Sequence, residues 1–173
     1  MTDAMDEAAA QFMRSQYREK MIEHVVIAEL WKEAWFRRQT VLEVLRSEVD
    51  GSGFDLLLEC NGTQRHVQLK ASIQGGSTRH QNINASLAAR AGGCVIWIVF
   101  DGNQDDGLTS LHYLFFGGGP GRNLPSLDEY KVAKHTRANA KGVKGERPAI
   151  RRLARSQFTQ IDSTANLFTA LFG

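Results

Sequence analysis

Hydrophobic residues recur along this chain with periods that predict one long helix followed by several strands. Between residues 8 and 38 there is no Gly or Pro, and the apolar residues from 22 to 34 follow the 3.6-residue period of an amphipathic helix. Residues 40–45 predict a strand, and residues 94–100, CVIWIVF, form an unbroken apolar run typical of a strand buried on both faces. Residues 111–116 predict one more strand.

Residues 53–70, GFDLLLECNGTQRHVQLK, predict a β-hairpin with polar side chains on one face. The Asn-Gly pair at 61–62 is the favoured two-residue turn, because both central residues must adopt positive φ. If this turn closes the hairpin, the numbers of cross-strand partners add up to 123, which places Asp55 opposite Gln68. Lys70 lies two residues further on and points to the same side. A carboxylate, an amide oxygen and a lysine are therefore predicted to converge.

Two further helices complete the predicted order. Residues 82–91 have apolar side chains at helical spacing and are followed by a Gly-Gly pair, which favours a helix that stops there. Residues 161–172 predict an amphipathic helix that packs back on the body of the protein. The order from about residue 10 to 101 is helix, three strands, helix and strand, with another strand behind it. At this length the chain predicts a single α/β domain, residues 1–173.

Asp55 followed on the next strand by Gln68-Leu69-Lys70 resembles the D…(D/E/Q)-x-K site of the PD-(D/E)XK nuclease superfamily. The Gln-x-Lys form is similar to that of the Mrr-like restriction endonucleases, whereas strict matches have Glu or Asp in the place of Gln68. The resemblance implies the restriction-endonuclease-like fold: an αβββαβ core over about residues 10–101, with a mixed central sheet flanked by helices. Residues 102–173 would be a basic C-terminal extension that ends in a helix.

The resemblance also implies hydrolysis of phosphodiester bonds with Mg²⁺ as cofactor and Mn²⁺ as the alternative ion. Cleavage by a metal-activated water needs hard oxygen ligands, and positive charge near the phosphate. Asp55 would be the shared metal ligand, joined by the side-chain oxygen of Gln68 and the backbone carbonyl of Leu69. Lys70 would activate the water or stabilise the transition state.

Sites of this family often take one more carboxylate from the first helix, and Glu23 is the residue we expect. Glu23 begins a row that is otherwise apolar, formed with Ile27, Leu30 and Ala34. Glu29 is the alternative, but its row also contains Glu33, which indicates a face that meets solvent.

Charge is segregated along the chain, which indicates a polyanionic partner. The net charge is +2, but residues 131–155 hold nine Lys or Arg against one acid, a net +8. Pro148 begins a short helix or strand in this segment. In a different part of the chain, the polar face of the second hairpin strand continues beyond Lys70 through Ser72 and Gln74. The residues predicted to contact nucleic acid are Ser72, Gln74, Lys141, Lys144, Arg147, Arg151, Arg152 and Arg155.

The sequence leaves several functions open. A metal-dependent nuclease acting on duplex DNA is the main prediction, and such nucleases often pair to cut both strands, which allows a homodimer. The alternatives are a catalytically inactive nuclease-fold domain that binds nucleic acid or a protein partner, and an RNA-directed nuclease or toxin. The chain contains no GxxxxGK[ST] loop, no GxSxG elbow and no zinc-like His/Cys spacing.

The cysteines and the apolar runs indicate a cytoplasmic protein. Cys60 and Cys94 have no CxxC spacing, so we expect no structural disulfide. No apolar run approaches the ~20 residues of a membrane span. The acidic start MTDAMDEAAAQ also lacks the pattern of a signal peptide.

Overall fold

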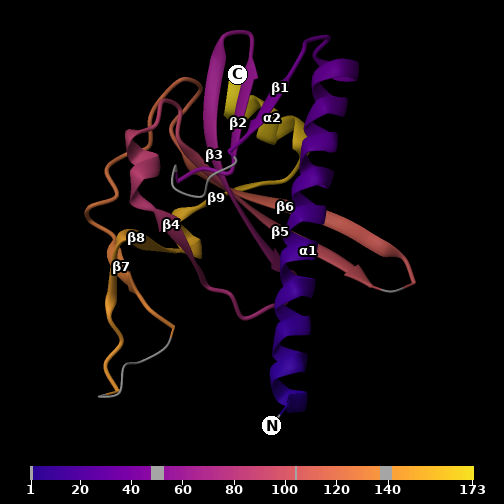
Figure 1. The fold of residues 1–173 in the computed structure, drawn as a ribbon. Coiled ribbons are helices and arrows are strands. Elements are labelled where there is room, and N and C mark those ends of the chain that lie inside the picture. The colour runs from indigo at the N-terminus through magenta and orange to yellow at the C-terminus, as the bar shows by residue number, and fades with distance from the viewer. Residues whose placement is uncertain (1, 48–52, 104, 137–141) are drawn as a thin grey trace.

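The computed structural model describes residues 2–47, 53–103, 105–136 and 142–173, with side chains from residue 15 onward. These residues form an α/β structure around a mixed central sheet (Figure 1). Helix α1 (Thr2–Lys32) is continued by a π-helical turn, η1 (Glu33–Arg37), and the chain ends in the short helix α2 (Thr164–Phe172). The described residues contain no helix long and apolar enough to cross a membrane.

The central sheet has six strands in the order β1-β2-β3-β5-β6-β9. Strands β3 and β5 run parallel, and every other neighbouring pair is antiparallel. The strands are β1 (Glu43–Arg46), β2 (Leu56–Cys60), β3 (Thr63–Ile73), β5 (Cys94–Asn103), β6 (Gly107–Gly117) and β9 (Thr159–Ile161). The extension predicted beyond residue 101 therefore supplies two strands of this sheet.

The hairpin of β2 and β3 has the register that its turn predicts. Asn61 and Gly62 adopt φ of 50° and 79°, and Leu56 pairs with Val67. Strand β2 begins only at Leu56, however, so the predicted pairing of Asp55 with Gln68 does not form as part of the ladder. Strand β3 continues to Ile73 and keeps β5 as its partner on one side.

Hydrophobic cores lie on both faces of the central sheet. Helices α1 and α2 pack on one face, over a core that includes Ile22, Leu30 and Leu167. The other core contains Trp97 and is covered by the crossover between β3 and β5 and by Leu124, Leu127, Leu153 and Phe158. Strand β5 is buried from Cys94 to Phe100, as its unbroken apolar run predicts.

A second sheet of three strands takes the place of a predicted helix. Its order is β4-β8-β7, formed by β4 (His80–Asn84), β8 (Glu146–Ala154) and β7 (Lys131–Lys134). The helix predicted for residues 82–91 is wrong, because β4 pairs with β8 and only the 3-10 turn η3 (Ala85–Ala89) follows. The side chain of Asn84 caps that turn by accepting a hydrogen bond from the Ser86 N–H. A second 3-10 turn, η4 (Arg155–Gln157), follows β8.

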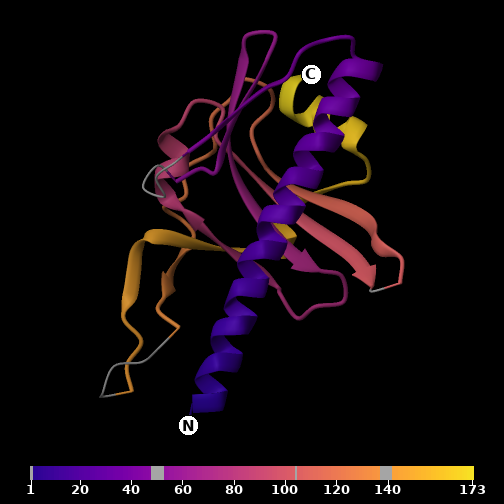
Figure 2. The same cartoon turned by 45° about the vertical axis from the view of Figure 1, so that its right-hand side comes forward.

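Strands β7 and β8 extend from the central sheet on the same side of the molecule as the amino-terminal half of α1 (Figures 1 and 2). In both views α1 passes in front of β5 and β6, and β7 and β8 lie to the left of α1.

Arg65 of β3 is fully buried, and its hydrogen bonds connect the sheet to the last helix, α2. Its guanidinium donates to the carbonyls of Leu171 and Ala170, both at 2.8 Å, and of Gly118 at 2.9 Å. The last carbonyls of a helix have no partner within the helix and carry the negative end of its dipole, so a buried cation there is stabilising.

We expect Arg65→Met to lower the free energy of unfolding by at least about 2 kcal/mol, because each buried carbonyl left without a donor costs about 1–3 kcal/mol. Urea denaturation followed by circular dichroism measures this loss. The control is Gln64→Met, on the same strand but with an exposed side chain. Equal stability of the two variants would contradict the role of Arg65.

Candidate functional site

A cavity of about 700 Å³ opens where β3 runs past the end of β2. Helix α1 supplies Lys20 and Glu23 to its wall, and β3 supplies Leu69 and Lys70. Asp55, just before β2, and residues 80–82 of β4 complete the polar part of the lining. The cavity thus joins segments that are far apart in the sequence at one open edge of the central sheet.

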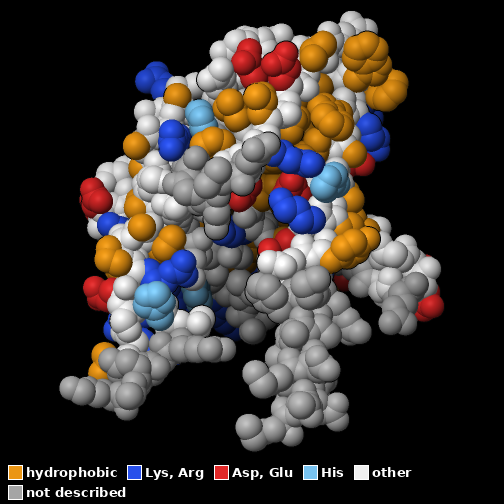
Figure 3. Space-filling view, in the orientation of Figure 1, with side chains coloured by type: hydrophobic (Ala, Val, Ile, Leu, Met, Phe, Trp, Pro, Cys, Tyr) orange, Lys and Arg blue, Asp and Glu red, His pale blue; other side chains and the backbone are white. Residues whose placement is uncertain are grey.

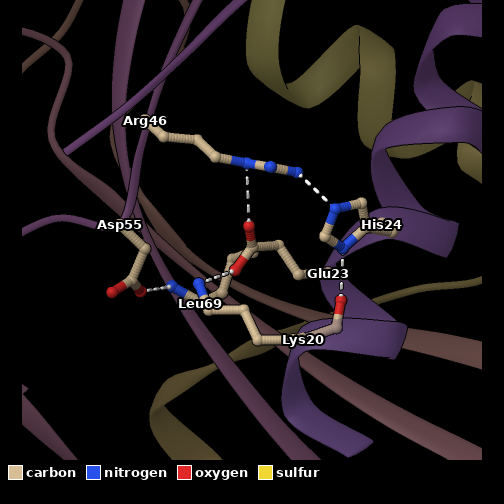
Figure 4. A network of polar contacts seen from close by, with 6 residues as sticks. All are labelled: Lys20, Glu23, His24, Arg46, Asp55 and Leu69. Carbon is tan, nitrogen blue, oxygen red and sulfur yellow. Dashed lines mark hydrogen bonds and ion pairs between the residues drawn. The ribbon is translucent and has the colours of Figure 1, made fainter. Parts of the chain in front are cut away.

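Asp55 occupies the position at which another strand residue would otherwise pair with β3. Its N–H donates to the Val67 carbonyl at 2.9 Å, and its Oδ2 accepts from the Leu69 N–H at 2.6 Å (Figure 4). In an extended strand the N–H and C=O of one residue point to the same side, so the Leu69 carbonyl also opens on this edge.

Burial raises the pKa of Asp55 above its ordinary value. The hydrogen bond from the Leu69 N–H and the charge of Lys70 oppose that rise, while the charge of Glu23 adds to it. The net direction is upward, so the ionised carboxylate of Asp55 is held in an environment less favourable to it than water. Such a carboxylate gains by binding a cation.

Glu23 is buried among charged partners, and its row on α1 faces inward as the sequence predicts. Its Oε2 lies 2.8 Å from the Nζ of Lys20, and its Oε1 lies 3.2 Å from the Nε of Arg46 on β1. His24 closes the network shown in Figure 4: its Nδ1 donates to the Lys20 carbonyl at 2.6 Å. Its Nε2 therefore accepts from the Nη2 of Arg46 at 2.9 Å.

Lys70 lines the cavity, but Gln68 is directed elsewhere, in contrast to the predicted convergence with Asp55. The Oε1 of Gln68 accepts a hydrogen bond from the Asn84 N–H of β4 at 3.1 Å. The physical reason is that β2 begins only at Leu56. Asp55 therefore lies outside the ladder, and its carboxylate accepts from the Leu69 N–H at the edge of β3.

The residues predicted to contact nucleic acid fall into different environments. Ser72 accepts a hydrogen bond from the Trp97 Nε1 at 2.8 Å, whereas Gln74 is exposed. Lys144 and Arg147 are exposed, and Lys141 lies outside the described residues. The remaining three predicted contacts are arginines with partners in the protein.

Each of these arginines has a different partner. Arg151 lies 3.8 Å from Asp128, and its side chain is only 14% exposed. Arg152 contacts His80, and Arg155 lies 5.5 Å from the centre of the Trp97 ring. Arg151 therefore belongs to the packing of the second sheet, and Arg152 is the one that reaches the wall of the cavity.

Sequence reasoning missed Lys20, Arg46 and the polar residues 80–82 as neighbours of the site. Lys20 could have been found, because it precedes Glu23 by three residues on one helix. Residues 80–82 could not, since their position depends on pairing with β8, which local periodicity does not encode.

The carboxylates of Asp55 and Glu23 and the carbonyl of Leu69 are the groups that could hold a divalent cation. Oε1 of Glu23 is buried and accepts no well-aligned hydrogen bond from the described residues, although Arg46 lies within ion-pair distance of it. An ion-pair contact without good alignment satisfies a buried oxygen poorly. No group of three or more His, Cys, Asp or Glu side chains gathers among the described residues. The two carboxylates and the carbonyl are hard oxygen donors, the kind that Mg²⁺ takes one or two of while it keeps several waters.

Comparison of the chain with protein-family models, with curated proteins and with solved structures finds no match.

We expect Asp55→Asn to raise the midpoint of thermal unfolding at pH 7–8. The variant removes a buried charge but keeps an oxygen that can accept from the Leu69 N–H. Because the folded-state pKa of Asp55 lies above its unfolded value of 3.8, the ionised carboxylate destabilises the fold above that pKa. The gain from Asn should therefore disappear as the pH falls through the folded-state pKa towards 3.8.

The measurement is thermal unfolding by circular dichroism between pH 8 and pH 3.5, with Asp101→Asn as the matched control. Asp101 is exposed on β5, away from the lining of the cavity. A lower unfolding midpoint for Asp55→Asn than for the unchanged protein at pH 7–8 would contradict the conclusion that the ionised carboxylate of Asp55 destabilises the fold.

Proposed function

We propose that this chain is a divalent-metal-dependent nuclease with a restriction-endonuclease-like fold, and that its substrate is DNA. The observation that carries the proposal is the meeting of Asp55, Glu23 and Lys70 around one cavity at the open edge of β3. Two carboxylates beside a lysine supply both the ligands for a hard cation and the positive charge that phosphodiester hydrolysis needs.

The order of elements supports this proposal. Helix α1 is followed by three antiparallel strands, β1 to β3, and then by a crossover to β5, which runs parallel to β3. This order resembles the αβββαβ succession of the nuclease superfamily, except that β4 and η3 stand where that succession has its second helix. Asp55 and Lys70 lie at the second and third strands, where the motif of that superfamily has its acid and its lysine.

The residues of the cavity would divide the chemistry between them. Asp55, Glu23 and the Leu69 carbonyl would hold the ion, which when bound would act as a Lewis acid and lower the pKa of a water molecule. Lys70 would stabilise the negative charge that develops on the phosphate. Lys20 would have to release Glu23 for this, and because its side chain is 68% exposed, its ammonium group could return to water once the ion takes its place.

Gln68 favours a second candidate function, a nuclease-fold domain that binds nucleic acid without cutting it. Its side-chain oxygen accepts from the Asn84 N–H, and a neutral amide replaces the acid that most members of the superfamily have there. A site with one carboxylate fewer binds Mg²⁺ more weakly, and this would reduce catalysis before it reduced binding of the substrate.

Cleavage of supercoiled plasmid, and of labelled DNA and RNA oligonucleotides, tests the proposal in Mg²⁺, Mn²⁺ or EDTA. We expect cutting only with the metals, and a loss of about 10²-fold or more in rate for Asp55→Asn and Lys70→Ala. Asp101→Asn and Lys32→Ala, which change the same residue types outside the cavity, serve as controls. The nuclease proposal fails if Lys70→Ala cuts as fast as the unchanged protein.

Gln68→Glu provides a separate test of the missing carboxylate. We expect cleavage to be retained or increased, because Glu can still accept from the Asn84 N–H and restores the carboxylate that strict matches of the superfamily have at this position. The rate is measured over a range of Mg²⁺ concentrations, and the half-maximal concentration should not rise. Cleavage that appears only in this variant would favour the binding domain as the natural function.

A further inference from the structure

A row of three polar side chains crosses the second sheet from strand to strand. Asn82 of β4 pairs with Arg152 of β8, which in turn pairs with Lys131 of β7. Residues directly opposite one another in antiparallel strands have their side chains on the same face. Asn82, Arg152 and Lys131 are all exposed. We call these three residues the polar row.

The polar row lies on the outer face of the second sheet. The neighbours of Asn82 and Arg152 that point the other way include Ile83 and Leu153, both fully buried in the core beneath. Arg151 also points to that inner side, where Asp128 lies near its guanidinium. The outer face therefore carries the cations of Arg152 and Lys131, and the row itself contains no acid.

The polar row begins at the cavity. Asn82 and His80 both line it, together with Asp55 and Lys70. Neighbouring strands are about 4.8 Å apart, so the row extends about 10 Å from Asn82 to Lys131, roughly three nucleotides of rise along one strand of a duplex. Figure 3 shows Lys, Arg and His side chains gathered over the part of the surface where β7 and β8 lie.

Arg152 also determines which ring nitrogen of His80 carries the proton. Its Nη2 lies 2.9 Å from the Nδ1 of His80, and a guanidinium can only donate, so Nδ1 accepts. The neutral ring then carries its proton on Nε2 and can donate from that atom. Burial and the charge of Arg152 lower the pKa of His80, which keeps the ring neutral.

We propose that the sugar–phosphate backbone of the substrate leaves the cavity across this outer face, along the polar row. Arg152 and Lys131 bind successive phosphates, and Asn82 and His80 donate hydrogen bonds where the strand enters the cavity. Neither the charge nor the donors depend on the base, so the row positions the strand without reading its sequence. The proposal rests on the proposed function for the class of substrate, but it concerns binding and can be tested without cleavage.

The test is binding of fluorescent duplex and single-stranded DNA in EDTA over a range of salt concentrations. The variant is Arg152→Ala with Lys131→Ala, and the control is Lys32→Ala with Arg37→Ala, which removes the same charge at the far end of α1. Each phosphate contact contributes about 0.9 to the slope of log affinity against log salt on duplex DNA, and about 0.7 on single strands. We expect the row variant to flatten the slope by about 1.8 or 1.4 respectively, and the control to leave it nearly unchanged.

Asn82→Asp is the second variant, because it places a carboxylate in the row while keeping the size of the side chain. We expect it to weaken binding at low salt, whereas the control variant binds as the unchanged protein does. Equal affinity and slope for the row variants and the control would overturn the proposal, as would an unchanged protein that shows no salt-dependent binding. Plasmid cleavage by the unchanged protein is read separately. If the protein cleaves plasmid but the row variants bind DNA as the control does, only the proposal about the polar row is refuted. If the row variants bind more weakly but no cleavage is seen, only the nuclease proposal is refuted.

Discussion

The candidate site depends on a difference in length between two paired strands. Strand β3 has 11 residues and β2 has five, so the edge of β3 beyond Val67 continues without a strand partner from β2. Backbone groups on such an edge need other partners, and a carboxylate is one that can accept from an N–H while keeping its charge. Asp55 fills this role at Leu69, and α1 and β4 close the space on either side. A longer β2 would leave no room for the cavity.

Charge around this edge is arranged so that each acid has a cationic neighbour. Glu23 has Lys20 and Arg46 as neighbours, and Asp55 has Lys70. A buried carboxylate is tolerated when it is paired with a cation. The same residues thus neutralise the two acids in the protein as it stands. The polar row adds two cations beyond the acids, Arg152 and Lys131.

Much of this fold follows from residues that are close in the sequence, and the rest depends on contacts between segments that are far apart in the sequence. The turn at Asn61 and Gly62, the inward row of α1 and the apolar run of β5 depend on neighbouring residues, and the structure has them as predicted. Residues 82–91 satisfy helical spacing, but Ile83 and Leu87 are buried equally well by a strand followed by a 3-10 turn once β8 is present. The direction of Gln68 and the carbonyls bound by Arg65 likewise depend on segments distant in the sequence.

The pairing of β4 with β8 also determines when the cavity can be completed during synthesis. His80 and Arg152 are separated by 72 residues, and Arg65 and Leu171 by 106. A nascent chain emerging from the ribosome would present Asp55, Glu23 and Lys70 well before the strand that holds their facing wall. Contacts of such wide separation form after the local ones, because the entropy of closing the loop must be overcome first. A truncated product of interrupted translation would therefore have the acids and the lysine without the wall that encloses them.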